Sequence, residues 1–237
     1  MGLLDEPVAA LAGQVRRWRA DRSLVQAAGP GPDGGPAMQA WPRGSSLVLR
    51  DDTAVELGEP TRGSRAVLLW KADDAAGDGL AGLARGVHRI GPDLGELAGA
   101  SAPLGRVVLA RGTFEDDFDA YLALQDAVSG ASLEGVSVRS RPSSGQVWMR
   151  ISAEAARGGL TLAHLGAALV AEVEAVDGVA AAAVLWICGD PDALRQLAPV
   201  ADAAARAIGA LVKRRTEDVM DCGSCEYNDI CDEAEAP

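Results

Sequence analysis

Three of the four cysteines are crowded near the C-terminal end of the chain, where Cys222, Cys225 and Cys231 have C-x2-C-x5-C spacing. Two thiolates separated by two residues converge on one side of a tight turn, and a third thiolate five residues later can close over the same metal centre. The alternative is an acidic tail that carries unrelated thiols. We favour an iron–sulfur centre, with zinc as the second candidate metal and a redox dithiol of Cys222 and Cys225 third.

A [4Fe–4S] cluster needs four ligands, and Cys188 is the remaining cysteine of the chain. It follows the apolar segment 181–187, which we expect to be a buried strand, and residues at strand ends often line a site. Two interpretations stay open for Cys188: a fourth metal ligand, or a small buried hydrophobe. Without Cys188, the fourth position would be held by a partner, by an oxygen ligand or by substrate.

Composition narrows the class of protein. The chain has 237 residues, of which 48% are hydrophobic but only 4% aromatic, so its core must be built from Ala, Leu and Val. A net charge of −12 disfavours nucleic acid and anionic membranes as partners. With no run of eighteen apolar residues and no signal-peptide pattern, we expect a cytoplasmic protein without a membrane segment, where clustered thiols indicate metal or redox chemistry.

The N-terminal part is predicted to be an amphipathic helix over residues 2–28, followed by a Gly/Pro linker over 29–36. The apolar residues Leu4, Val8, Leu11, Val15 and Trp18 fall at helical spacing. We expect residues 1–36 to serve assembly and not the site. Such a helix can pack on its own domain, pair with a copy of itself, or dock in a partner's groove.

The pattern of the central part, residues 37–215, predicts an α+β domain. Strands are expected at 46–50, 53–57 and 65–70, while 72–86 is ambiguous. From residue 104 the order becomes β-α-β-β-α-β-α. Its expected elements are strand 106–111, helix 114–128, strands 136–140 and 146–152, helix 162–176, strand 181–187 and a helix capped by Asp190 that begins at Pro191. This order suggests an antiparallel or mixed sheet with helices on one face, similar to a split βαβ sandwich, and residues 216–237 form the cysteine segment.

Six short motifs over about 170 residues carry a resemblance to a known family. They are Glu56–Pro60, Ile90–Leu94, Ala102–Gly105, Phe114–Phe118, Trp148–Ser152 and Leu162–Gly166. In this order, and with cysteines following, they resemble the acetyl-CoA synthase (β) subunit of the carbon monoxide dehydrogenase/acetyl-CoA synthase complex. The match covers that family's middle α+β domain and the start of its cluster domain. The chain lacks the family's nickel-binding Cys-Gly-Cys motif and its long N-terminal docking domain, and its cysteine spacing is shorter. We therefore expect no complete nickel–iron site.

The resemblance also implies a coenzyme A site, because a family tryptophan at the place of Trp148 lies among arginines implicated in holding coenzyme A. Arg139, Arg141 and Arg150 accompany Trp148 in this chain. On strands, Arg139 and Arg141 share one face, as do Trp148 and Arg150. Guanidinium groups can hold a phosphate while the indole stacks on adenine. The alternative is a surface strand with solvated arginines and a half-buried tryptophan.

Two classes of role follow from these features. The first is a small iron–sulfur subunit, not catalytic alone, that serves electron transfer or partner docking within a larger anaerobic redox or acyl-CoA complex. The alternative is a component of a split acetyl-CoA synthase-like, acyl or C1 transferase enzyme that binds coenzyme A, or a zinc-binding interaction module. His88 and His164, the two histidines, are far apart in sequence and are expected to be structural.

Anaerobic purification tests the metal prediction directly. The protein should contain iron and acid-labile sulfide in about equal amounts, near four of each per chain for a cubane cluster. Elemental and sulfide analysis on the same sample measures both. About one zinc per chain with no sulfide would replace the iron–sulfur interpretation by the zinc one.

Overall fold

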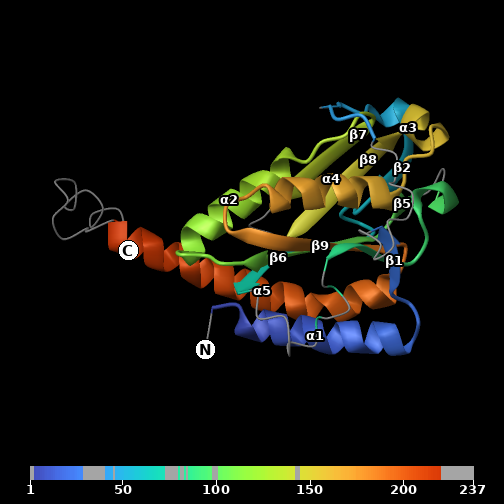
Figure 1. Cartoon of the computed structure of the whole chain (residues 1–237). Coiled ribbons are helices and arrows are strands. Elements are labelled where there is room, and N and C mark those ends of the chain that lie inside the picture. Colours follow the sequence, from blue (N-terminus) through green and yellow to red (C-terminus); the bar gives the residue numbers. More distant parts are fainter. Residues whose placement is uncertain are drawn as a thin grey trace, which may run out of the picture.

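The computed structural model describes residues 3–28, 41–44, 46–72, 80, 83, 85–97, 101–141 and 145–219 (Figure 1). It is an α+β structure with two mixed sheets and helices packed against them. The α+β class predicted from the sequence is therefore confirmed. The second sheet and the helices on both faces of the first one are features that the sequence pattern did not predict.

The larger sheet has five strands in the order β1-β4-β9-β6-β3. They are β1 (Val25–Ala28), β4 (Gly86–Ile90), β9 (Val179–Cys188), β6 (Leu104–Gly112) and β3 (Ser64–Ala72). The central pair, β6 and β9, is antiparallel, while β3 runs parallel to β6 and β4 parallel to β9. Every residue of β6 is buried, as expected for a strand covered on both faces.

The smaller sheet has four strands in the order β5-β2-β8-β7. They are β5 (Ser101–Ala102), β2 (Thr53–Leu57), β8 (Gln146–Ser152) and β7 (Val136–Arg141). Burial alternates along β8, with Val147, Met149 and Ile151 buried and the residues between them more exposed. Because side chains alternate across a strand, one face of this sheet packs inward and the other faces outward.

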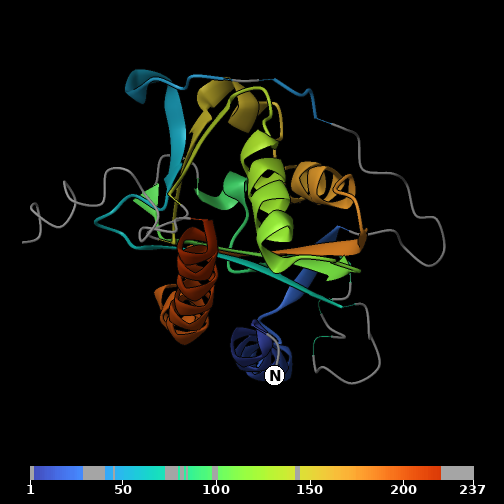
Figure 2. The same ribbon diagram turned by 90° about the vertical axis from the view of Figure 1, so that its left-hand side faces the viewer.

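Helices cover both faces of the larger sheet. α1 (Asp5–Ala20) and α5 (Pro191–Val219) lie on one face, and α2 (Asp117–Gly130) and α4 (Leu162–Glu174) lie on the other (Figure 2). The short helix α3 (Ala153–Arg157) follows β8 directly. As predicted, Asp190 caps α5, and its Oδ1 accepts hydrogen bonds from the backbone N–H groups of Asp192 at 3.0 Å and Ala193 at 2.9 Å. Among the described helices, none has the length and apolar character needed to cross a membrane.

The N-terminal helix packs on its own domain. Leu11, Val15 and Trp18 are buried in the core, and Trp18 Nε1–H donates to Gln196 Oε1 on α5 at 2.7 Å. Of the three arrangements considered for this helix, the structure shows the packing of the helix on its own domain. The assembly role expected for residues 1–36 is therefore not supported over 3–28, and the 29–36 linker lies outside the described residues.

Two predicted element boundaries are corrected. The single helix over 2–28 ends at Ala20, because Arg22 takes a left-handed backbone conformation (φ 56°) and the chain turns into β1. The strand expected at 46–50 does not form: residues 46–49 have no regular structure, and Arg50–Asp52 is a 3-10 turn that leads into β2. Residues 25–28 pair with β4, a contact between distant segments that local spacing does not encode.

Truncation of the Trp18 side chain tests whether α1 belongs to the core. Trp18→Ala should lower the free energy of unfolding by about 3–5 kcal/mol, because it removes a large buried side chain and leaves a cavity against α5. The exposed neighbour Arg17 gives the control Arg17→Ala, which should stay within about 0.5 kcal/mol of the parent. Urea unfolding measures both, and equal values for the two variants would place α1 outside the cooperative core.

Candidate functional site

The predicted metal ligands Cys222, Cys225 and Cys231 lie outside the described residues. Within the described ranges, no group of three or more His, Cys, Asp or Glu side chains is arranged to hold a metal ion. The iron–sulfur centre therefore stays a prediction based on cysteine spacing. Of the four candidate ligands, only Cys188 lies in the described part of the chain.

Cys188 is fully buried at the end of β9, with no exposed surface. Burial, followed by the nearby negative charge of Asp93, raises the pKa of the Cys188 thiol to about 12. A thiol must lose its proton to bind a metal, and the buried surroundings of Cys188 oppose that loss. Of the two interpretations kept open for Cys188, this environment favours the small buried hydrophobe.

Chain geometry gives the same result. α5 begins three residues after Cys188 and contains 29 residues, so it is about 43 Å long at about 1.5 Å per residue. Figure 1 shows the helix running without a break along the sheet and away from the end of β9. A cluster shared by Cys188 and the C-terminal cysteines of the same chain would require the segment after Val219 to return along the whole helix.

The predicted anion-binding residues come together on the outer face of the smaller sheet. Arg139 on β7 is the direct cross-strand partner of Trp148 on β8, and Glu56 on β2 is the partner of Arg150 on the other side. Trp148 and Arg150 are two residues apart and so share a face. We call Glu56, Arg139, Trp148 and Arg150 the Trp148 platform. Arg141, the fourth predicted residue, pairs with Gln146 at the end of β7, and its side chain lies outside the described residues.

Glu56 organises the Trp148 platform. It belongs to the first family-like motif, but the sequence predicted no role for it. Its Oε1 accepts hydrogen bonds from Trp148 Nε1–H and from Arg150 Nε–H, each at 3.0 Å. The guanidinium carbon of Arg150 lies 4.3 Å from the centroid of the Trp148 ring, and that of Arg139 lies 5.4 Å away. The indole is therefore held in one orientation between two cations. The role of Glu56 depends on how β2 is aligned with β8, and that strand register could not be predicted from the sequence.

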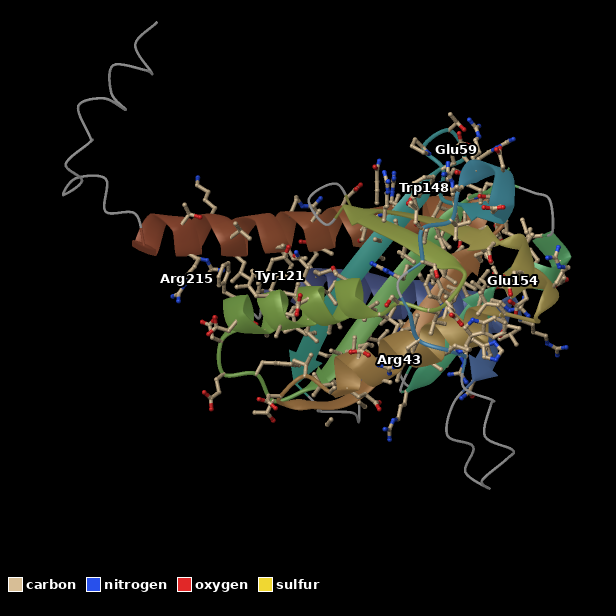
Figure 3. All side chains as sticks on the ribbon, turned by 90° about the horizontal axis from the view of Figure 1, so that it is seen from above. Arg43, Glu59, Tyr121, Trp148, Glu154 and Arg215 are labelled. Atoms are coloured by element: carbon tan, nitrogen blue, oxygen red, sulfur yellow. The ribbon has the colours of Figure 1, made fainter. Side chains whose placement is uncertain are left out.

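An open pocket of ≈ 370 Å³ adjoins the Trp148 platform and is also lined by Arg50, Gly58 and Glu59. Three arginines and two glutamates face it, which gives a local charge of +1 in a chain of net charge −12. Figure 3 shows Trp148 and Glu59 at the same corner of the molecule. Gly58 has φ 73°, and a side chain there would meet the backbone oxygen of Val147 at 2.2 Å, so this corner depends on glycine.

Four of the six family-like motifs meet at one junction of loops. The backbone N–H of Gly58 donates to Ala102 O at 2.9 Å, and Leu162 N–H donates to Asp93 Oδ1 at 2.9 Å. Gly189, just after Cys188, donates its N–H to Pro103 O at 3.1 Å. Each of these hydrogen bonds joins residues far apart in the sequence, so several of the motif residues have structural roles in this packed corner.

Both histidines have structural surroundings. His164 Nδ1 accepts a hydrogen bond from the backbone N–H of Thr161 at 3.1 Å, which completes the capping box of α4. His88 is buried in β4, where burial lowers its pKa, with a backbone hydrogen bond at Arg85 opposing that shift. A buried, mostly neutral imidazole and a helix cap agree with the structural roles expected for the pair.

No protein-family model and no curated protein matches this chain. The resemblance to the acetyl-CoA synthase subunit therefore rests on the six motifs and the cysteines, and it stays a prediction.

Replacing Cys188 tests its exclusion from the metal site. Cys188→Ala should keep the ratio of bound metal to protein found in the parent, because Cys188 is fully buried at the end of β9, where the 29-residue helix α5 begins. Cys225→Ala is the matched comparison and should lower that ratio. Metal analysis of the purified variants measures both, and a comparable loss in Cys188→Ala would make Cys188 a ligand despite its burial.

Proposed function

We propose that this chain is a small iron–sulfur subunit of a larger redox or acyl-CoA complex, and that it binds coenzyme A or an acyl-CoA on the Trp148 platform. In this role it is cytoplasmic and not catalytic alone. The cysteine segment would carry the cluster, and the α+β domain would hold the nucleotide part of the ligand.

The observation that carries this proposal is the position of Trp148 between Arg139 and Arg150 beside an open pocket. Coenzyme A combines an adenine ring with several phosphate groups. A flat aromatic ring supports stacking of adenine, and guanidinium groups match phosphate oxygens in charge and geometry. Glu56 already orients Arg150 and the indole, so less ordering is needed when a ligand binds.

Arg139 is the platform cation best placed to meet a phosphate. No described carboxylate forms an ion pair with it, whereas the Nε of Arg150 is engaged by Glu56. A phosphate would gain a charge-assisted hydrogen bond from Arg139 without breaking an existing pair. The local charge of +1 also favours an anion at this corner over the rest of an acidic surface.

Binding of coenzyme A to the full chain tests the proposal. Titration calorimetry should detect binding of coenzyme A, with much weaker binding of pantetheine, which lacks the phosphates and the adenine. Arg139→Gln should weaken coenzyme A binding roughly 10-fold or more, because a hydrogen bond between charged groups contributes about 1.5–3 kcal/mol.

Arg195→Gln is the matched control, because it removes one arginine that is 75% exposed on α5 and outside the pocket. It should leave coenzyme A binding unchanged. Absence of coenzyme A binding at millimolar concentration, or equal binding by Arg139→Gln and the parent, would contradict the assignment of the Trp148 platform.

A further inference from the structure

A second cavity, of ≈ 490 Å³, lies on the inner side of the smaller sheet. It opens to solvent and is lined by residues of β6 and β9, of β7 and β8, and of α2 and α4. We call it the Arg106 cavity, and its principal lining residues are Arg106, Val138, Ser140, Leu165, Leu169 and Trp186. Its volume falls in the range of small-molecule sites.

The Arg106 guanidinium is enclosed but poorly partnered. Arg106 is 5% exposed in the middle of β6, and its Nη2–H donates to Ser140 Oγ at 3.2 Å. Its Nε has no hydrogen-bond partner, and no described carboxylate pairs with it. Although burial lowers the pKa of Arg106 to about 10, the guanidinium stays charged at neutral pH.

A second unpaired donor lines the same cavity. Trp186 on β9 is the cross-strand partner of Arg106, is 2% exposed, and its Nε1 has no hydrogen-bond acceptor. The smaller adjoining pocket toward β3 shares Arg106 and Ser140 and adds Gln125, whose Oε1 is also buried without a partner. Two unsatisfied polar atoms of residues that line this cavity, and a third in the adjoining pocket, are costly unless a ligand or water meets them.

The charge and the shape together indicate the ligand. Water can satisfy hydrogen bonds, but an anion also offsets the charge of a buried guanidinium. A carboxylate matches the buried guanidinium of Arg106 in charge and geometry, and the second arginine that lines the cavity, Arg139, is exposed to solvent. Most other walls are apolar, with Val138, Leu165 and Leu169 among them, so the rest of the ligand should be an aliphatic chain.

We propose that the Arg106 cavity binds a monocarboxylate with a short aliphatic chain. The Arg106 guanidinium donates to one carboxylate oxygen. The Ser140 hydroxyl accepts from Nη2 and therefore keeps its own proton to donate to the other oxygen. The chain lies between β7 and α4, against Val138 and Leu165. Arg139 lines both this cavity and the pocket beside the Trp148 platform, but the other linings differ: Ser140 and Met149 face this cavity, whereas Trp148 and Arg150 line the other pocket.

Thermal unfolding of the full chain with sodium hexanoate and with 1-hexanol tests the charge requirement. Hexanoate at millimolar concentration should raise the Tm in a dose-dependent way, since a ligand that binds the folded state stabilises it. Uncharged 1-hexanol should give no comparable rise. The Tm shift should be lost in Arg106→Met and retained in Arg195→Gln and in Trp148→Phe. No shift with any carboxylate from acetate to octanoate, or a full shift in Arg106→Met, would overturn the proposal.

Two further measurements keep the test decisive if Arg106→Met does not fold. Val138 is 38% exposed at the wall of the cavity, so Val138→Trp should fold, fill the space and abolish the hexanoate shift. In nuclear magnetic resonance spectra, hexanoate should move the indole N–H signal that disappears in Trp186→Phe. A full hexanoate shift in Val138→Trp, or an unmoved Trp186 signal, would contradict binding in this cavity. Neither readout depends on coenzyme A, so failure here is distinguishable from failure at the Trp148 platform.

Discussion

The antiparallel pairing of β6 with β9 is the constraint on which the rest of the structure depends. Both strands are apolar and must be covered on both faces, which requires α1 and α5 on one side and α2, α4 and the smaller sheet on the other. A polar residue on the inner face of this pair is enclosed by necessity. The register of β6 and β9 places Arg106 opposite Trp186, so two buried nitrogen atoms without hydrogen-bond partners among the described residues lie close together beneath the cavity.

The smaller sheet separates two kinds of chemistry by the alternation of its side chains. On β7 and β8, Ser140 and Met149 face the Arg106 cavity, Trp148 faces the pocket on the outer side, and Arg139 lines both pockets. The outer arginines lie beside solvent and beside Glu56, so their charges are screened or paired. The charge of the inner Arg106 is neither screened by solvent nor paired with a carboxylate among the described residues. Burial of this charge therefore costs more free energy than placing the outer arginines at the surface.

α5 leads away from the buried Cys188 to the last described residue, Val219. It starts at the strand end that buries Cys188 and carries the chain along the sheet toward the cysteine segment. Its packing against α1, through Trp18 and Gln196, ties the N-terminal residues to the same core. The protein therefore keeps a neutral thiol in its interior, while the residues with metal-ligand spacing belong to a different end of the chain.

The sequence by itself determined the α+β class, the elements from β6 to α5 except α3, and the cap at Asp190, because these depend on local periodicity and capping chemistry. It also indicated which residues of β7 and β8 share a face. Only the tertiary structure decided that residues 25–28 join the sheet, that Glu56 holds Trp148 and Arg150, and that Arg106 is enclosed without a carboxylate. These features depend on contacts between segments far apart in the chain, and strand register and burial, unlike periodicity, are properties of the assembled sheets.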